Sequence, residues 1–287
     1  MSFLNQITRL IKDPPPNHLF ELSEAGLAFA QGGQTGFQAF EPGTLVPSPV
    51  EDNVLRADAI LSTIQKLSPA SGAKKRRPAA VILPDYAARV TVLDFDSFPA
   101  AVEEQASLVR FRVKKTIPFD IDSAAVSYFV QPAPAGQKKV DVLAVTVALE
   151  VIARYEALFR TAGFHPGVVT TATIAALNLY KADGISVLAK LSGRALTVAV
   201  ISGSAIKLFR CVQMEEASAD EILAVLHPTF AYVEDELKQP VGKLILCGIP
   251  VEIAAGLRCE SDVLRSRFGA AGPFNAGLLG YLEQITN

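Results

Sequence analysis

The residues of this chain that could perform chemistry are few and stand far apart. Its histidines are His18, His165 and His227. None of the three has a cysteine or a second histidine at the spacing of a metal-ligand set. Two pairs of carboxylates stand two residues apart, Asp94 with Asp96 and Asp120 with Asp122. That spacing is typical of turns and helix ends in solvent, so we predict neither a metal site nor a catalytic acid–base pair.

Sequence motifs for nucleotide binding and for nucleophilic catalysis are also missing. Gly242-Lys243 is followed by Leu244 instead of Ser or Thr, and no glycine stands at the Walker A spacing before it. The cysteines are Cys211, Cys247 and Cys259. Their odd number and the lack of a C-x-x-C spacing indicate thiols in a reducing compartment rather than a disulfide framework. Each lies in or beside an apolar segment, so we interpret them as small buried side chains.

Composition places the chain among globular proteins and excludes several classes. It has 287 residues with 27 Lys and Arg against 29 Asp and Glu, half of its residues are hydrophobic, and its mean hydropathy is +0.30. This balance argues against disorder and against a bulk nucleic-acid binder, which carries a strongly basic face. The longest stretch without a charged residue, 161–180, contains His165-Pro166-Gly167 and does not read as a membrane span. No secretory signal is recognisable, so we expect a soluble, cytoplasmic protein.

The first 17 residues are predicted to be an appendage. On a helix over residues 1–12, one stripe carries the apolar side chains Phe3, Leu4, Ile7, Leu10 and Ile11. Pro14-Pro15-Pro16 then forms a stiff spacer, so residues 1–13 are expected to be dispensable for folding. The stripe packs on its own domain or binds a membrane surface or a partner groove; these alternatives stay open. The basic run 74–77 is interpreted as a solvated loop, with anionic lipid as its alternative partner.

The rest of the chain alternates strands with helices. Expected strands are 18–22, 27–31, 79–83, 88–95, 125–131, 140–147, 168–169, 185–191, 195–201, 205–212 and 243–247. Expected helices are 48–67, 100–116, 150–162, 172–180, 218–238 with an interruption at His227-Pro228, 251–257 and 275–285. Each half of the chain opens with antiparallel strands. The pattern therefore predicts two α/β halves, each with a mixed sheet.

Several segments, in their order along the chain, resemble one known family. The helix that ends in Arg110-Phe111-Arg112 is followed by an Ile117-Pro118-Phe119 corner and by a strand. Strands at 81–84 and 90–93 precede that helix, and a strand, a helix with Tyr155 and the segment 162–166 follow it. This succession, over residues 18–287, resembles the PilM family of type IV pilus assembly proteins, which are related to the cell-division protein FtsA.

The resemblance implies an actin-like (ribonuclease H-like) two-lobed α/β fold with mixed sheets. It implies a first lobe over 18–147, in which about 50–147 contain an inserted small subdomain, and a second lobe over 148–287. The stretch 211–237 is short compared with the family, in which a small subdomain covers the nucleotide. We therefore expect this lid subdomain to be reduced or missing.

Actin-like ATPases hold Mg-nucleotide through three turns, and each turn departs from the family pattern here. Glycines in such turns let backbone N–H groups approach phosphate, and an acid holds Mg²⁺. The first turn carries Ser23 where the family has Gly, and in the second Ala189 or Lys190 replaces the metal-organising Asp. In the third turn only Gly248 survives, because Ile249 and Pro250 replace small residues. The degenerate positions of the cleft are Glu21, Ser23, Gly26, Lys190, Ser192, Gly193 and Gly248.

The function implied is that of a non-catalytic, actin-like scaffold in a type IV pilus or related secretion assembly. It would bind no cofactor and no nucleic acid, and would lie at the cytoplasmic face of the inner membrane. Its partner would be the cytoplasmic tail of a single-span, PilN-like membrane protein, with a homo-oligomer left open. The residues expected to bind this partner or a membrane are Phe111, Ile117, Pro118, Phe119, Phe3, Leu4, Ile7, Leu10 and Ile11. The alternatives are an active ATPase of the same fold, which would bind ATP and Mg²⁺, and, more weakly supported, a sugar-kinase-like enzyme.

Overall fold

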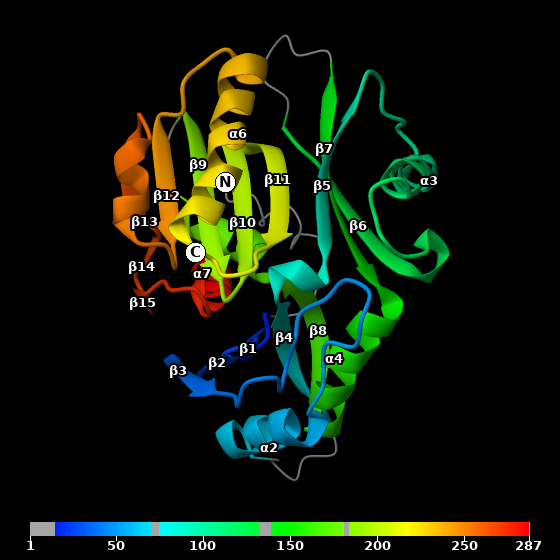
Figure 1. Cartoon of the computed structure of the whole chain (residues 1–287). Helices are drawn as coiled ribbons and strands as arrows, with labels where there is room; N and C mark the ends of the chain where they lie inside the picture. The colour runs from blue at the N-terminus through cyan, green and yellow to red at the C-terminus, as the bar shows by residue number, and fades with distance from the viewer. Residues whose placement is uncertain (1–14, 70–74, 133–138, 181–183, 287) are drawn as a thin grey trace. The chain divides into compact units, whose positions relative to one another are not determined.

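The chain folds into two compact units, each built from separate stretches of sequence (Figure 1). The computed structural model describes residues 15–69, 75–132, 139–180 and 184–286. The first unit takes its described residues from 1–88, 148–180 and 265–287, and the second from 89–147 and 181–264. The helix expected over residues 1–12 and the first residue of the basic run, Lys74, lie outside the described residues.

The first unit contains a five-stranded mixed sheet of order β3–β2–β1–β4–β8. Its strands are β1 (His18–Ser23), β2 (Gly26–Gln31), β3 (Gln34–Ala39), β4 (Arg77–Leu83) and β8 (Phe164–Thr171). The β1–β2 hairpin agrees with the sequence prediction and pairs Ser23 with Gly26. Strand β3 was not predicted, because its sequence QTGFQA lacks the alternation of large apolar residues that marks a half-buried strand.

Helices cover both faces of this sheet, because alternate residues of β1 point to opposite faces. Leu19 belongs to a buried cluster with Leu278 and Tyr281 of α7 (Ala276–Thr286). Phe20 points the other way, and its ring lies 5.1 Å from that of Phe159 in α4 (Leu149–Thr161). The remaining helices among the described residues of this unit are α2 (Ala57–Leu67), η1 (Asp85–Ala87), α5 (Ala172–Ala176) and η3 (Leu177–Leu179). Strands β14 (Arg265–Ser266) and β15 (Gly269–Ala270) form a small ribbon.

Helices α5 and α7 approach each other so closely that only glycine fits at the crossing. A methyl group built on Gly280 would lie 2.1 Å from the carbonyl oxygen of Ala175. One built on Gly277 would lie 2.8 Å from the Cα atom of Ala172. Glycine costs about 1 kcal/mol relative to alanine inside a helix, so its use at both positions indicates that backbone contact outweighs helix propensity.

The start of α5 is held by a buried carboxyl group. Both oxygens of Asp85 accept hydrogen bonds from Thr173, one from the backbone N–H and one from the hydroxyl, each at 2.7 Å. The bonded N–H belongs to the first turn of the helix, where such groups have no partner within the helix. Asp85 therefore ties the end of the β4 segment to the helix that crosses α7.

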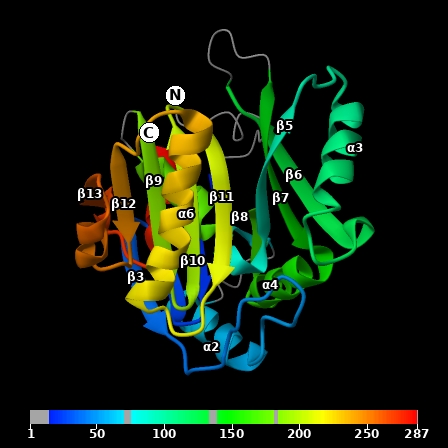
Figure 2. The same ribbon diagram turned by 45° about the horizontal axis from the view of Figure 1, so that its top comes forward.

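The second unit contains a five-stranded sheet and a three-stranded sheet. The first has the order β11–β10–β9–β12–β13, with strands β9 (Ile185–Ser192), β10 (Ala195–Ser202), β11 (Ala205–Gln213), β12 (Lys243–Cys247) and β13 (Glu260–Val263). Helix α6 (Ala219–Leu237) runs along β9, β10 and β11 in both views (Figures 1 and 2). It continues through Pro228, where an interruption was expected, because Ile222, Leu226 and Val233 on both sides of the proline are buried in one core.

The three-stranded sheet and helix α3 form the inserted subdomain that the family resemblance implies. The sheet has the order β5–β7–β6, with β5 (Arg89–Phe95), β6 (Ala124–Val130) and β7 (Val140–Ala148). Helix α3 (Val102–Val113) and η2 (Ile121–Ser123) complete it. The insertion begins at Arg89 rather than near residue 50, because β4 belongs to the sheet of the first unit.

Side chains of the insertion bind the edge strand β11 of the same unit. The carboxamide of Gln131 donates to the carbonyl of Ile206 at 2.8 Å and accepts from its N–H at 2.7 Å. Lys207 Nζ lies 2.6 Å from Asp141 Oδ2, with both side chains largely buried. The compact units thus differ from the expected lobes, because residues 148–180 and 265–286 pack with the first strands and the insertion packs with the later ones.

Two predicted helices differ from the observed structure. Residues 48–56 form a loop instead of the start of a helix, because the Asn53 side chain binds both the N–H and the carbonyl of Ser48 and accepts the Tyr155 hydroxyl. The predicted helix 251–257 is the 3₁₀ helix η4 (Val251–Gly256). Between β11 and β12 the chain forms the single helix α6, so the expected reduction of the lid is confirmed.

Candidate functional site

The carboxyl group of the first hairpin is used inside the fold. Glu21, on β1, is 1% exposed, and its Oε2 atom accepts a hydrogen bond of 2.7 Å from the backbone N–H of Leu278. Leu278 is the third residue of α7, so this N–H is one of the helix-terminal donors without a partner in the helix. A carboxyl oxygen at a helix N-terminus is also favoured by the helix dipole. The side chain at the acidic position of the hairpin therefore anchors α7 to β1.

The turn of this hairpin is closed by Ser23. Its hydroxyl donates to the carbonyl of Gly26 at 3.0 Å and accepts the N–H of Gly26 at 3.2 Å. The carbonyl of Ala25 accepts the N–H of Phe40 at 2.9 Å. A phosphate cradle needs backbone N–H groups that point at the ligand, and the Gly26 N–H is already bonded within the turn. The serine that replaces the family's glycine thus has a local structural role.

The second hairpin carries a buried lysine. Lys190, near the end of β9, is 0% exposed, and its Nζ lies 3.2 Å from the Ser192 hydroxyl. The β9–β10 turn contains Gly193 at a φ of 57°, and the Arg194 carbonyl accepts the N–H of Met214 at 2.8 Å. A lysine side chain offers no carboxylate oxygen, the ligand type that Mg²⁺ prefers.

The third turn follows β12 directly. Gly248 has a φ of 69°, a conformation that side chains with a Cβ atom rarely adopt. The next residue, Ile249, is 6% exposed and packs into the apolar core of the second unit. Its bulk is therefore part of the core, and Pro250 caps the short helix η4.

Two of the three turns meet at one sheet edge. Strands β9 and β12 are parallel neighbours, and Cys247 pairs with Lys190, so Gly248 follows beside the end of β9. Glu21, Ser23 and Gly26 lie in the first unit, and the other degenerate positions lie in the second. Among the described residues, no group of three or more His, Cys, Asp or Glu is arranged to hold a metal ion.

The residues expected to bind a partner have different environments. Phe111 on α3 is 63% exposed, whereas Ile117 and Phe119 are half-buried against the core of the inserted subdomain and Pro118 is exposed. The apolar stripe Phe3, Leu4, Ile7, Leu10 and Ile11 lies outside the described residues. Sequence analysis did not select Val102, which is 65% exposed at the start of α3. The sequence pattern places Val102 on the same helix face as Val109 and Val113, which predicts burial; Val109 and Val113 are buried, but the prediction is wrong for Val102.

Burial disfavours ionisation of one thiol and one phenol of the described chain. Burial raises the pKa of the Cys259 thiol and raises the pKa of Tyr281 to about 12. Both groups therefore stay protonated near neutral pH, as expected for structural side chains. The Lys139 ammonium bonds to Asp94 at 2.7 Å and lowers the pKa of that carboxyl. Asp94 thus takes part in a surface ion pair, in agreement with its interpretation as a solvated carboxylate.

Among the described residues, no helix combines the length and apolar character required to cross a bilayer. No protein-family model and no curated protein sequence matches the chain. Solved structures do match over nearly the whole length. A structure of the PilM–PilN type IV pilus biogenesis complex aligns with a TM-score of 0.69 and 16% identity, over 96% of this chain and 100% of that one.

Two further structures share the fold. The cytoplasmic domain of EpsL, an inner-membrane component of the type II secretion system of Vibrio cholerae, aligns with a TM-score of 0.52 and 14% identity, over 94% of each chain. A Bacteroides thetaiotaomicron protein with an actin-like ATPase fold aligns with a TM-score of 0.52 and 12% identity, over 94% of this chain and 95% of that one. This chain therefore has the actin-like fold, and its resemblance to the PilM family holds at the level of that fold.

Proposed function

We propose that the chain is a non-catalytic, actin-like scaffold of a type IV pilus or related secretion assembly. In this role it binds the cytoplasmic tail of a single-span inner-membrane protein and lies peripherally at the cytoplasmic face of that membrane. Support comes from the fold shared with the PilM–PilN complex and with the cytoplasmic domain of EpsL. Scaffolding of this kind requires a peptide-binding surface and a stable fold, and it requires no phosphate chemistry.

The hydrogen bond between Glu21 and Leu278 carries the non-catalytic part of the proposal. A carboxylate that organises Mg²⁺ must offer its oxygens to metal-bound water. Glu21 is buried and gives Oε2 to the N-terminus of α7. In the second hairpin Ala189 or Lys190 stands at the position where the family resemblance places a metal-organising Asp, so no carboxylate is present there. The residues present therefore do not fit Mg-nucleotide, and we derive no catalytic step through it.

Calorimetry with Mg-ATP tests this part directly. We expect no binding heat at millimolar nucleotide, because the Glu21 carboxyl group of the first hairpin is bonded to α7 and the second hairpin has Ala189 and Lys190 in place of a carboxylate. Ser23→Gly restores the family's glycine in the first turn and is expected to remain without binding, because the second and third turns are unchanged. A micromolar dissociation constant for the unmodified chain would overturn the non-catalytic assignment and support the active ATPase.

The inserted subdomain offers the surface for an extended tail. Strand β6 lies at one edge of the sheet β5–β7–β6, and among the described strands it pairs only with β7. An edge strand can take a further extended peptide through main-chain hydrogen bonds, with alternate side chains entering apolar sites. Phe111 and Val102 on α3 are large apolar side chains left exposed on the same subdomain. A disordered tail loses entropy on binding, so micromolar affinity is the expected range.

Phe111→Ala is expected to weaken binding of such a tail about thirtyfold, which corresponds to the loss of about 2 kcal/mol at which an interface residue counts as a hot spot. The probe is a fluorescently labelled peptide from the cytoplasmic tail of a single-span pilus protein encoded beside this chain, measured by fluorescence polarisation. Phe111 suits the test better than Phe119, because Phe119 is half-buried and its loss perturbs the core of the subdomain. Phe37→Ala is the matched control, since Phe37 is also an exposed aromatic, at 46%, but lies on β3 of the first unit.

The two variants separate the outcomes of this test. Loss of affinity in Phe111→Ala, with Phe37→Ala unchanged, supports a tail site on the inserted subdomain. Equal affinities for both variants and the parent place the tail elsewhere. If the parent itself shows no binding up to about a millimolar, the scaffold proposal loses its main support.

A further inference from the structure

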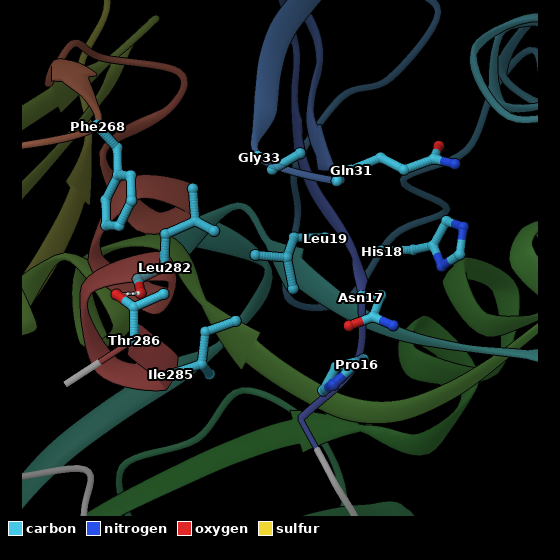
Figure 3. A pocket seen from close by; sticks show the side chains of 12 residues that line it. Pro16, Asn17, His18, Leu19, Gln31, Gly33, Phe268, Leu282, Ile285 and Thr286 are labelled. Atoms are coloured by element: carbon cyan, nitrogen blue, oxygen red, sulfur yellow. Dashed lines mark hydrogen bonds between the residues drawn. The ribbon is translucent and has the colours of Figure 1, made fainter.

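The first unit contains an apolar pocket beside the point where the described chain begins. Its volume is about 580 Å³, which is within the range of cavities that hold a small-molecule ligand or a group of apolar side chains. The start of β1, the β2–β3 turn and the last turns of α7 form its walls (Figure 3). The apolar residues of the lining are Pro16, Leu19, Ala30, Phe268, Leu282 and Ile285.

The pocket leaves apolar surface of α7 without a cover among the described residues. Leu19 and Leu282 face each other across the hollow, and Phe268 lies at its side (Figure 3). Leu282 and Ile285 are only half-buried, although both pack against the cluster that includes Leu19. Apolar surface of this kind is stabilised when another apolar group removes it from water.

The chain itself supplies a matching group. Pro16 is part of the pocket wall and connects directly to the fourteen residues 1–14, which lie outside the described part of the structure. Within those residues the sequence places five large apolar side chains on one helical stripe. A polyproline segment rises about 3.1 Å per residue, so Pro14–Pro16 spans only about 9 Å. Leu10 and Ile11 are the members of the stripe nearest to this spacer, and so nearest to the pocket.

We propose that the apolar stripe of residues 1–12 docks in this pocket of its own chain, with the side chains nearest the spacer against the half-buried Leu282 and Ile285. A tether this short gives an effective concentration in the millimolar range, which favours the chain's own segment over a separate partner. While docked, the stripe is withheld from membrane surfaces and partner proteins. Docking is therefore a means of regulating membrane or partner contact, and it does not depend on the proposed scaffold function.

Fluorescence can test the docking, because the chain contains no tryptophan and a single introduced one reports alone. Leu10→Trp places the reporter on the apolar stripe, and Arg9→Trp places it on a polar position next to it. We expect blue-shifted emission and protection from acrylamide in Leu10→Trp and solvent-like emission in Arg9→Trp. Adding Leu282→Glu to Leu10→Trp is expected to shift the emission to the red, because a charge then lines the pocket.

Two further variants serve as controls for the fluorescence experiment. Ile285→Glu is a second pocket variant for the case that Leu282→Glu does not fold, as judged by circular dichroism. Val251→Glu adds the same charge at a residue that is 49% exposed in the second unit, and it is expected to leave the emission of Leu10→Trp unchanged. Solvent-like emission in Leu10→Trp overturns the proposal. A blue shift that grows with protein concentration overturns the proposal and means that the stripe binds a second copy of the chain. A blue shift that requires anionic vesicles overturns it and means that the stripe binds a membrane.

Deletion of residues 1–13 is a second test. The proline spacer by itself predicts that these residues contribute nothing to stability, whereas docking predicts that they do. If the segment docks, deleting it lowers the thermal midpoint of unfolding. Deleting it from the Leu282→Glu variant is then expected to lower the midpoint of that variant no further. The spacer argument predicts an unchanged midpoint. An unchanged midpoint together with solvent-like emission rejects docking on two independent measurements.

Discussion

Gly280→Ala is expected to lower the free energy of unfolding by about 3 kcal/mol, the upper range for overpacking in a tight contact. The added methyl group would lie 2.1 Å from the Ala175 carbonyl oxygen and 2.7 Å from its carbonyl carbon. Both atoms belong to the backbone of α5, so neither can rotate away, and the two helices must separate. Chemical denaturation followed by circular dichroism measures the change.

Gly256→Ala is the matched control for this substitution. Gly256 ends η4, and a methyl group built there has no atom within 4 Å apart from those of its two neighbours in the chain. The same change of residue is therefore expected to be neutral within about 0.5 kcal/mol, as for surface substitutions. Because alanine has the higher helix propensity, a Gly280→Ala variant as stable as the parent would mean that α5 and α7 do not cross as closely as described.

Glu21→Ala is expected to lower the free energy of unfolding by about 2 kcal/mol, the range for hydrogen bonds to a charged group. The substitution leaves the Leu278 N–H buried without its 2.7 Å acceptor at the N-terminus of α7. Glu21→Gln keeps an acceptor oxygen and is expected to lose less. Both are measured by denaturation, in parallel with Gly280→Ala, because all three changes act on the attachment of α7.

Glu41→Ala is the control for the loss of a carboxylate. The Glu41 side chain is 82% exposed and pairs with Arg56 at the surface, so its removal is expected to change stability by less than about 1 kcal/mol. If Glu21→Ala is as stable as Glu41→Ala, then the carboxyl group of Glu21 does not anchor α7. That result would return Glu21 to the set of residues available for a metal, and with it the active ATPase.

The alternation of apolar and polar residues was sufficient to predict most of the strands and helices of this chain. The β1–β2 hairpin follows from two short apolar runs joined by Ser23-Glu24-Ala25-Gly26. The closing helix, predicted at 275–285, is observed at Ala276–Thr286. These elements are encoded locally, because burial on one face imposes its own period on the sequence. The order of such elements predicted two α/β halves, and the resemblance to the PilM family added the actin-like fold and the reduced lid.

Elements whose form depends on distant partners were not predicted correctly. The loop 48–56 carries the sequence signals of a helix start, yet Asn53 is bound by Ser48 and by Tyr155, which is 102 residues away. Strand β3 has little apolar character of its own and forms because its backbone pairs with the edge of β2. Helix α6 passes through Pro228 because the residues around it are buried together. Tertiary packing outweighs local preference in each case.

The sequence by itself determined which chemical groups stand in the three turns: by its resemblance to the family, Ser23 in place of glycine, Ala189 or Lys190 in place of a carboxylate, and Ile249 in place of a small residue. Only the tertiary structure decided what those groups do. Glu21 and Leu278 are 257 residues apart in the chain, and their hydrogen bond exists because β1 and α7 pack in one core. Likewise, the closeness of Gly280 to Ala175 cannot be inferred from either helix alone. A residue type sets the chemistry that a position offers, and the partner brought to it by folding sets how that chemistry is used.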